Sequence, residues 1–208
     1  MGKMDEQILV APRKDVFEDE QLTFQGVSTN KDVNRLILEN MASTYSVMRR
    51  GDAEEDENYK QPIPYAALTR GNELFVYKRL GGGGETRLHD SLSIGVGGHC
   101  NQTNHDTFEA TLKENLDREL EEELFIESDI MHHSTIGLIN DDENDVGRVH
   151  IGLLTLIELD IDSTVTVRET DQLEGQWMTL DELSKQENYN RLEAWSQYIV
   201  DYLNNPLT

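Results

Sequence analysis

The sequence predicts an α/β fold in which a mixed sheet lies between helices, preceded by an N-terminal extension over residues 1–60. Three observations predict this class. Apolar, β-rich runs cover residues 63–69, 73–79 and 91–96, and a long amphipathic helix follows them at 107–124. Further along the chain come two more apolar strands and a second amphipathic helix. Such interleaving of strands and helices is typical of a sheet that is covered by helices.

Composition restricts the partners of the chain. Its 208 residues are enough to bury a core, and its formal net charge of −23 disfavours nucleic-acid backbones and anionic membranes. We therefore expect no nucleic acid and no membrane as partners. The single cysteine, Cys100, excludes an intrachain disulfide, and there is neither a signal peptide nor a run of about 18 apolar residues. These features favour a cytoplasmic location.

The extension, residues 1–60, carries weaker patterns. Residues 8–10 and 22–24 are candidates for short strands, and apolar side chains at helical spacing predict a helix over 33–41. The acidic run 52–57 is most simply a solvated loop. A lid and a dimerisation element are both open roles for this extension.

The next segment is predicted to be a β-hairpin. Strands at 63–69 and 73–79 are joined by Arg70-Gly71-Asn72, a favourable turn. Four glycines follow at 81–84, without the helix N-terminus or the Lys-Ser pair of a phosphate-binding loop. We interpret them as a hairpin tip.

The helix predicted at 107–124 carries a row of carboxylates beside an apolar ridge. Leucines at every fourth position, from Leu112 to Leu124, form the ridge that packs on the sheet. Glu119, Glu122 and Glu123 stand at i, i+3 and i+4, within one arc of the helix surface. Carboxylate oxygens are the preferred ligands of hard divalent cations, so this row is a candidate site for Mg²⁺ or Mn²⁺. Bound cations would also let an acidic chain attract a phosphate-bearing substrate.

This helix carries a motif of a known family. Arg118-Glu119-Leu120-Glu121-Glu122-Glu123 and Ile126 resemble the second half of the Nudix box, whose pattern ends in Arg-Glu-U-x-Glu-Glu-x-Gly-U with U a bulky aliphatic. Three features depart from the box. Phe125 replaces its glycine, Ala110 stands where an upstream glutamate is expected, and the pair Gly97-Gly98 lies further from the helix than the pattern allows. Residues 100–106 therefore look like a loop insertion.

The resemblance implies a Nudix-type α/β/α sandwich over residues 61–208 and hydrolysis of a phosphoanhydride bond. The substrate would be a nucleoside-diphosphate-linked or related small molecule. The resemblance assigns Glu119, Glu122 and Glu123 to the catalytic metal site, with the carbonyl of Gly97 as a further ligand of Mg²⁺ or Mn²⁺. Arg118 is expected to orient these carboxylates. Many Nudix proteins are homodimers, so a second copy of the chain is a candidate partner.

Substrate contacts are expected on both sides of the glycine-rich tip and in a later acidic loop. Lys78, Arg79 and Arg87 flank the tip and are candidates to grip phosphate, or else serve surface solubility. Glu169 and Glu174, in the loop before Trp177, are candidates for substrate contact or for the general base, or else are ordinary loop acids.

The remaining elements complete the sheet and its cover. Strands are predicted at 134–140 and 149–160, joined by a polar turn at 141–147. Thr179 is expected to cap a short helix, and a terminal amphipathic helix is predicted at 191–204.

Three alternatives remain open. His99, Cys100 and His105 offer zinc ligands, but their spacing matches no standard pairing and a fourth ligand is not evident. A catalytically weak or inactive Nudix-like nucleotide-binding domain would account for Ala110 and Phe125. Isopentenyl diphosphate isomerases share the architecture but place Cys-Gly-His where this chain has Gly97-Gly98-His99, and the missing thiol argues against isomerisation.

Overall fold

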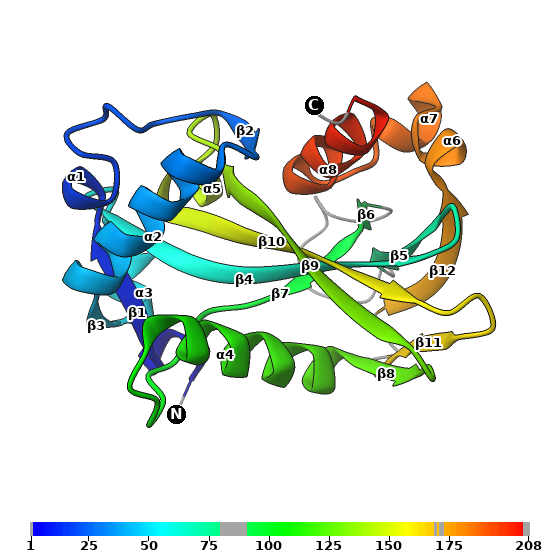
Figure 1. Cartoon of the computed structure of the whole chain (residues 1–208), viewed down its shortest axis with the longest axis horizontal. Helices are drawn as coiled ribbons and strands as arrows, with labels where there is room; N and C mark the ends of the chain where they lie inside the picture. The colour runs from blue at the N-terminus through cyan, green and yellow to red at the C-terminus, as the bar shows by residue number, and fades with distance from the viewer. Residues whose placement is uncertain (1, 80–90, 169, 171–172, 206–208) are drawn as a thin grey trace. The chain divides into compact units, whose positions relative to one another are not determined.

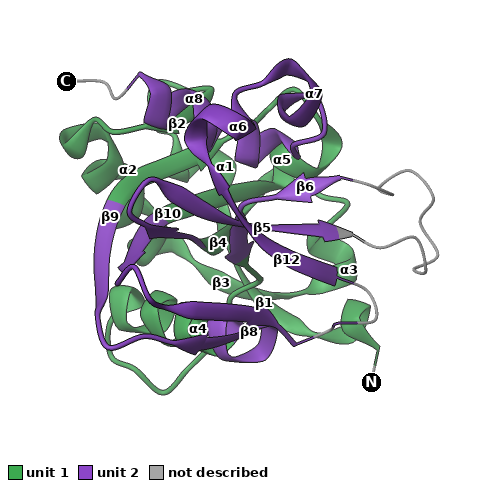
Figure 2. Cartoon of the chain, turned by 90° about the vertical axis from the view of Figure 1, so that its right-hand side faces the viewer, with its two compact units in different colours: residues 1–65, 97–118, 136–154 green, residues 66–96, 119–135, 155–208 purple. Residues whose placement is uncertain are grey.

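The computed structural model describes residues 2–79, 91–168, 170 and 173–205 (Figure 1). The chain forms two compact units. Unit 1 comprises Met1–Tyr65, Gly97–Arg118 and Ile136–Leu154, and unit 2 comprises Ala66–Val96, Glu119–Thr135 and Thr155–Thr208 (Figure 2). Four long elements contribute residues to both units: strand β4 (Tyr59–Arg70), helix α4 (Phe108–Glu123), strand β9 (Met131–Asn140) and strand β10 (His150–Leu159).

The architecture is mixed α/β, as the sequence predicts. The hydrogen-bonded order of the large mixed sheet is β12-β5-β4-β10-β9-β2, with four further strands paired alongside this path. A second sheet pairs β8 with β11. The other strands are β1 (Gln7–Pro12), β2 (Gly26–Ser28), β3 (Ser46–Arg49), β5 (Glu73–Arg79), β6 (Leu92–Ser93), β7 (Gly95–Gly97), β8 (Leu124–Glu127), β11 (Thr164–Val167) and β12 (Leu173–Thr179).

In unit 1, strand β1 is buried on both faces. Leu9 and Ala11 point into one apolar cluster, while Ile8 and Val10 point into another with Ala53. Strand β1 also pairs antiparallel with β3, which runs beside it in Figure 1. The larger cluster joins apolar residues of several elements of unit 1, among them helix α2 (Lys31–Thr44) and the first two turns of α4. Its buried members are Leu9, Ala11, Val16, Phe17, Ile37, Met41, Cys100, Phe108, Leu112, Leu138 and Ile151. The expected strand at 8–10 and helix at 33–41 are therefore confirmed.

The strand expected at 22–24 is absent, and this prediction is wrong. Glu18, Asp19 and Glu20 all adopt positive φ angles, which turns the chain directly after helix α1 (Arg13–Val16). Leu22 then bonds back from its N–H to the carbonyl of Phe17, and its side chain packs on the larger cluster. The strand begins only at Gly26, as β2.

The acidic run 52–57 is exposed at Asp52, Glu55 and Glu57, as expected of a solvated loop, but Ala53 and Glu54 depart from that expectation. It begins inside the short helix α3 (Arg50–Ala53), where Ala53 is fully buried between β1 and β3 residues. The side chain of Glu54, the next residue, is only 24% exposed. The apolar Ala53 thus draws the start of the run into the protein.

In unit 2, strands β5 and β12 form a continuous antiparallel ladder. Phe75 and Trp177 face each other in it, with ring centroids 5.3 Å apart at an edge-on angle, and Arg70 lies 4.2 Å from the centroid of the Trp177 ring. A side chain at Gly175 would place its Cβ 2.4 Å from the Phe75 ring, so this strand position accepts only glycine.

Three short helices close unit 2: α6 (Leu180–Leu183), α7 (Gln186–Tyr189) and α8 (Ala194–Asn204). Thr179 caps α6 in a capping box with Glu182, as expected. Helix α8 is held to the β6–β7 segment because Ile94 N–H donates to the Ser196 hydroxyl at 3.0 Å and Glu193 N–H donates to the Leu92 carbonyl at 3.0 Å. The sequence predicts one strand at 91–96, whereas the structure divides it into β6 and β7 at Ile94.

Helix α4 is confirmed within a residue at each end of its predicted range, and it passes directly into strand β8. Phe125 therefore lies in an extended strand opposite Thr166, where the Nudix pattern has a glycine. The glycines 81–84 lie outside the described residues. No helix among the described residues is long and apolar enough to cross a membrane. The boundary expected at residue 60 stays a prediction.

Candidate functional site

Three side chains from distant segments of unit 1 converge on one point. Glu54 follows helix α3, His99 follows strand β7, and His150 is the first residue of strand β10. Each offers one ligand atom, and these atoms all lie within 4.8 Å of one another. In the described part of the chain, no other three His, Cys, Asp or Glu side chains meet in this way. We call this group the His-Glu cluster.

The distances within the His-Glu cluster suit a single metal ion. The two Nε2 atoms of His99 and His150 are 3.1 Å apart, and Oε1 of Glu54 is 3.2 Å from the His99 Nε2. The Glu54 Oε2 lies 3.9 Å from the His150 Nε2. Two donor atoms that sit about 2.1 Å from one ion lie roughly 3.1–3.4 Å apart when their bonds enclose about 95–110°. Two of the three separations fall in or near this range.

The protonation of His150 is set by its surroundings. Its Nδ1 lies 2.6 Å from the carbonyl oxygen of Val146, and since a carbonyl only accepts, Nδ1 carries the proton. Burial lowers the pKa of His150 to about 4, so the ring is neutral near pH 7. Its Nε2 therefore presents a lone pair to His99 and Glu54.

Glu54 is ionised. The hydrogen bond from His99 lowers the pKa of the Glu54 carboxyl to about 2, against the opposing effect of burial. Arg50 lies on its other side, with Nε 3.4 Å from Glu54 Oε1 and Nη1 3.4 Å from Glu6 Oε2. The cluster thus contains one negative carboxylate and one neutral imidazole whose Nε2 has a lone pair, and a metal ion would displace the Nε2 proton that His99 shares with Glu54.

The short helix α5 (Asp145–Val149) positions His150. Asn144 caps it by accepting a hydrogen bond from the N–H of Gly147 at 2.8 Å. A Cβ on Gly147 would lie 2.0 Å from the carbonyl oxygen of Asp141, so only glycine fits this close approach. The turn expected at 141–147 is therefore partly helical. Helix α5 ends at Val149, directly before the buried His150.

A fully buried lysine, Lys60, holds helix α5 and the residue after it in place through hydrogen bonds. Lys60 Nζ donates to the carbonyls of Gly147 and His150 at 3.0 and 3.2 Å, and pairs with Asp142 Oδ1 at 3.0 Å. All three of its protons have acceptors. Burial lowers the pKa of Lys60 to about 8, with Asp142 opposing the change.

Asp142 is held on both oxygens. Arg13 donates to Oδ1 and Oδ2 at 2.7 and 2.8 Å, and its remaining donors bind Glu20 at 2.8 Å. Burial would raise the pKa of Asp142, but hydrogen bonds from Arg13 and Asn140 and the charge of Lys60 hold it well below its usual value. This ionic network fixes the backbone on which His150 is mounted.

The backbone of His99 is held in place by the middle of helix α4. Arg118 donates from Nη2 to the His99 carbonyl at 3.0 Å and to Asn115 Oδ1 at 3.3 Å. Asn115 in turn accepts from the N–H of Asn101 at 2.9 Å and donates to its carbonyl at 3.0 Å. The loop after Gly97-Gly98 is therefore clamped to the helix. Arg118 thus orients this loop, and its expected role in orienting the carboxylates stays a prediction.

The other predicted metal ligands belong to different units of the chain. Glu119, Glu122 and Glu123 lie in the unit 2 part of α4, with Glu122 exposed and the other two partly buried. Among the described residues they do not form a second group with ligand atoms within 4.8 Å, so a metal ion on this row stays a prediction. Gly97 lies in unit 1, where a Cβ would meet the Pro64 carbonyl at 2.3 Å.

Two of the predicted substrate-binding residues face each other. Lys78 on β5 and Glu174 on β12 are directly opposite in the antiparallel ladder, and Arg79 is opposite Leu173. Arg87 and Glu169 lie outside the described residues. The predicted contacts of all five with substrate stay predictions.

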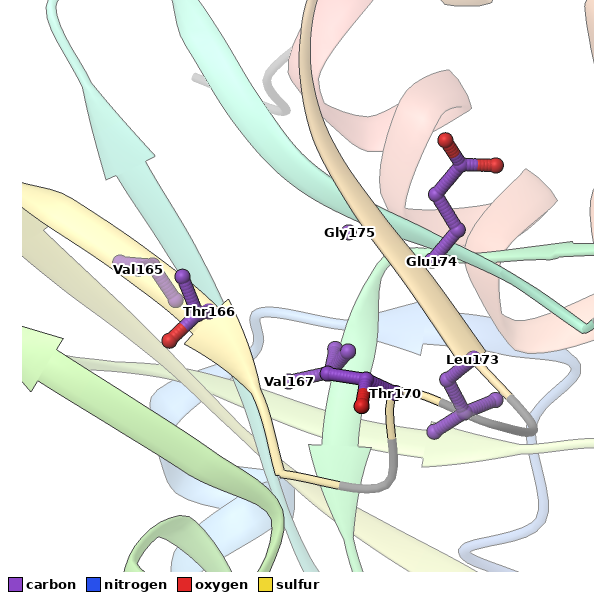
Figure 3. Close-up of a pocket in the computed structure, with 7 residues that line it drawn as sticks. All are labelled: Val165, Thr166, Val167, Thr170, Leu173, Glu174 and Gly175. Carbon is purple, nitrogen blue, oxygen red and sulfur yellow. The ribbon is translucent and has the colours of Figure 1, made fainter.

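A pocket of about 440 Å³ in unit 2 lies beside this pair. It is lined by Val165, Thr166, Val167, Thr170, Leu173, Glu174 and Gly175 (Figure 3). The Glu174 side chain points away from the other lining side chains (Figure 3). None of the described lining residues is cationic, so among them only hydroxyl and backbone N–H groups could donate to a phosphate.

The histidine and cysteine residues singled out for zinc do not meet. Cys100 is buried in the larger apolar cluster, and the Nε2 of His105 lies 2.7 Å from Glu114 Oε2. His99 instead meets Glu54 and His150, neither of which the sequence indicated as a ligand. The one feature that could have indicated this site is His150, a single histidine at the start of a largely apolar strand, and this feature does not predict which residues it meets.

Comparison with solved structures identifies the fold. The chain is similar to Tm1382, a candidate Nudix hydrolase, with a TM-score of 0.77 and 29% sequence identity, covering 97% of this chain and 100% of Tm1382. DR0079 from Deinococcus radiodurans is a more distant match, with a TM-score of 0.49 and 18% identity over 70% of this chain and 82% of DR0079. The likeness to Tm1382 shows that the chain has the Nudix fold.

Sequence comparison then identifies the family. No protein-family model matches the sequence. The chain is 54% identical over 205 residues to Protein YmaB of Bacillus subtilis (strain 168), covering 98% of this chain and 100% of YmaB. It belongs to the family of Protein YmaB.

Proposed function

We propose that the chain is a divalent-metal-dependent hydrolase that cleaves a phosphoanhydride bond in a nucleoside-diphosphate-linked or related small molecule. The observation that carries this proposal is its likeness to Tm1382, a candidate Nudix hydrolase, over 97% of the chain at 29% identity. The Arg-Glu-Leu-x-Glu-Glu motif, Arg118 to Glu123, supports it, because the motif lies on a regular helix as the Nudix pattern requires. The same proposal includes a homodimer, in which a second copy of the chain is the partner, and a cytoplasmic location.

Glu119, Glu122 and Glu123 would hold Mg²⁺ or Mn²⁺. Their carboxylate oxygens are the donor type that these ions prefer, and their partial exposure leaves room for waters and phosphate oxygens. When bound, the metal neutralises phosphate charge and acidifies a bound water. Arg118 keeps the start of this row in place through its bond to the His99 carbonyl.

Lys78 is the residue we propose for phosphate contact. It stands opposite Glu174 on the same face of the β5–β12 ladder, so Glu174 can orient the ammonium group. Arg79, the next residue of β5, stays a second candidate for phosphate contact.

The test is a Mg²⁺-dependent hydrolysis screen against nucleotide sugars, dinucleoside polyphosphates, NADH, coenzyme A and oxidised nucleotides. With the best substrate, Glu122→Gln should lower turnover by about 100-fold or more, since it removes a ligand charge from the metal site. Glu121→Gln is the matched control, because Glu121 is an exposed neighbour on the same helix outside the motif. Equal turnover in the two variants would remove Glu122 from the site.

A second candidate function is nucleotide binding without hydrolysis. Phe125 favours it, because α4 passes straight into β8 where the Nudix pattern has a glycine turn, and Ala110 removes the upstream glutamate. Nucleotide binding with no product from any substrate in the screen would support this alternative. Isomerisation of isopentenyl diphosphate has no thiol to use at Gly97, and Cys100 is buried.

A further inference from the structure

We propose that Glu54, His99 and His150 form a binding site for a transition-metal dication, with Zn²⁺ as the best match, separate from the Mg²⁺ site proposed on helix α4. The two sites share no ligand. This inference does not depend on hydrolytic activity.

The donor set selects the class of ion. Mg²⁺ is held by oxygen ligands and keeps several waters, whereas imidazole nitrogen suits Zn²⁺, Fe²⁺ and other transition metals. Two histidines and one carboxylate are a known ligand set for zinc with an open position and for non-haem iron. Since affinity for nitrogen donors rises along the first transition series, Zn²⁺ should bind this cluster more tightly than Mn²⁺ or Fe²⁺.

Hydrogen bonds to the protein fix the orientation of the ligand atoms. His150 donates its Nδ1 proton to the Val146 carbonyl at 2.6 Å, which fixes the ring and leaves Nε2 as the ligand atom. Metal-bound histidines commonly make this kind of second hydrogen bond. The Nε2 of His99 faces it at 3.1 Å, and Glu54 approaches His99 at 3.2 Å.

The low exposure of the three side chains also supports a metal site. The side chains of His150, His99 and Glu54 are 7%, 12% and 24% exposed, so the cluster is largely screened from bulk water and remains open on the Glu54 side. Three protein ligands leave at least one coordination position for water or a small anion. Lys60 and Arg50 add positive charge nearby, but each is paired, with Asp142 and with Glu6 and Glu54 respectively.

The surroundings also contain an unsatisfied acceptor. Gln61 is 1% exposed and donates from Nε2 to the carbonyl of Ala53, the residue before Glu54, at 3.1 Å. Its Oε1 has no hydrogen-bond partner among the described residues. A buried acceptor without a partner is uncommon in folded proteins, and a bound ion or an ordered water is one explanation for it.

The alternative is a hydrogen-bonded cluster that needs no ion, in which the Nε2 proton of His99 is shared between Glu54 and His150. The two explanations differ in what a metal titration shows. A hydrogen-bonded cluster takes up no Zn²⁺ in a fixed ratio, whereas a metal site binds one ion per chain.

The test is calorimetric titration of the whole chain with ZnCl₂ and, separately, MgCl₂, after treatment with a chelator and its removal. We expect one Zn²⁺ per chain, and binding weakened by about 100-fold or more in Glu54→Gln and His99→Gln. His105→Gln is the control, because His105 is an exposed histidine paired with Glu114 outside the cluster. It should bind Zn²⁺ within about twofold of wild type. Loading with Co²⁺ should give a visible spectrum that Glu54→Gln loses.

Glu122→Gln separates this inference from the proposed hydrolysis. It should bind Zn²⁺ like the wild type while losing Mg²⁺-dependent turnover, and a chain with no activity at all should still bind Zn²⁺. The inference is overturned if the wild type takes up no Zn²⁺ in a 1:1 ratio, if Glu54→Gln binds as tightly as wild type, or if Mg²⁺ binds the cluster more tightly than Zn²⁺. Glu54→Gln is nearly isosteric, so a circular dichroism spectrum matching the wild type keeps the result decisive even if His99→Gln fails to fold.

Discussion

The His-Glu cluster of unit 1 and the glutamate row of helix α4 are built in opposite ways. The cluster takes one residue from each of three distant segments and depends on buried polar groups to hold them. The glutamate row lies within two turns of one helix and is partly exposed. A site of the first kind is organised by the fold, because tertiary packing brings its ligands together. The metal site that we propose on the glutamate row would be organised by local spacing, and a bound ion would offset the repulsion between the carboxylates.

The largest loss of stability is expected when the carboxylate that supports the His-Glu cluster, Asp142, is removed. Asp142→Ala leaves the ammonium group of the fully buried Lys60 without its carboxylate. Removing one partner of a buried ion pair typically costs about 3–5 kcal/mol of unfolding free energy. Asp145→Ala, at a 96% exposed aspartate only three residues along, should cost at most about 1 kcal/mol. Urea denaturation measures both, and a similar small loss for the two variants would show that Lys60 does not depend on Asp142.

A smaller effect is expected at the turn that positions His150. In Gly147→Ala the new Cβ would lie 2.0 Å from the Asp141 carbonyl oxygen, so the backbone of α5 must shift. Overpacking of this kind costs about 1–3 kcal/mol. Zn²⁺ affinity should fall in the same variant, since His150 follows this helix. Gly2→Ala, whose Cβ would have its nearest neighbour at 3.7 Å, is the control and should change stability by less than about 0.5 kcal/mol. Unchanged stability and Zn²⁺ affinity in Gly147→Ala would separate α5 from the cluster.

Acid should weaken unit 1 through the same network. The pKa of Asp142 is held below its ordinary value of about 3.9, so the stability it contributes is fully present above that pH and is lost as the pH falls toward the folded-state pKa. The unfolding free energy of the wild type should therefore decline below about pH 4, and the decline should be shallower in Asp142→Asn. Denaturant midpoints measured at intervals from pH 6 to pH 2 check this. Parallel profiles for the two proteins would mean that other carboxylates cause the acid loss.

Local patterns predicted one of these regions and not the other. Helix α4 and its glutamate row follow from leucine spacing and a motif that lie within 15 residues of sequence, Leu112 to Ile126, and the structure has this helix as Phe108–Glu123. The hairpin of β4 and β5 and the cap at Thr179 are similarly local. Glu54 was hidden in an acidic run whose composition indicates a solvated loop, and only the burial of Ala53 brings it inward. His150 lies at the head of an apolar strand, and its partners are set by long-range pairing that no local pattern records.

The smallest expected effect tests whether the glutamate row needs an ion. Glu119→Gln removes one carboxylate of the row, and its stability without Mg²⁺ is the baseline for the comparison. Mg²⁺ should then stabilise the wild type more than this variant, because binding to the native state adds RT ln(1 + [L]/Kd) and the variant has lost a ligand charge. Thermal unfolding with and without Mg²⁺ measures this difference, with Glu121→Gln as control. Equal Mg²⁺ stabilisation of wild type and Glu119→Gln would exclude Glu119 as a ligand. Loss of Mg²⁺ stabilisation in Glu54→Gln instead would move the functional ion from the helix to the His-Glu cluster.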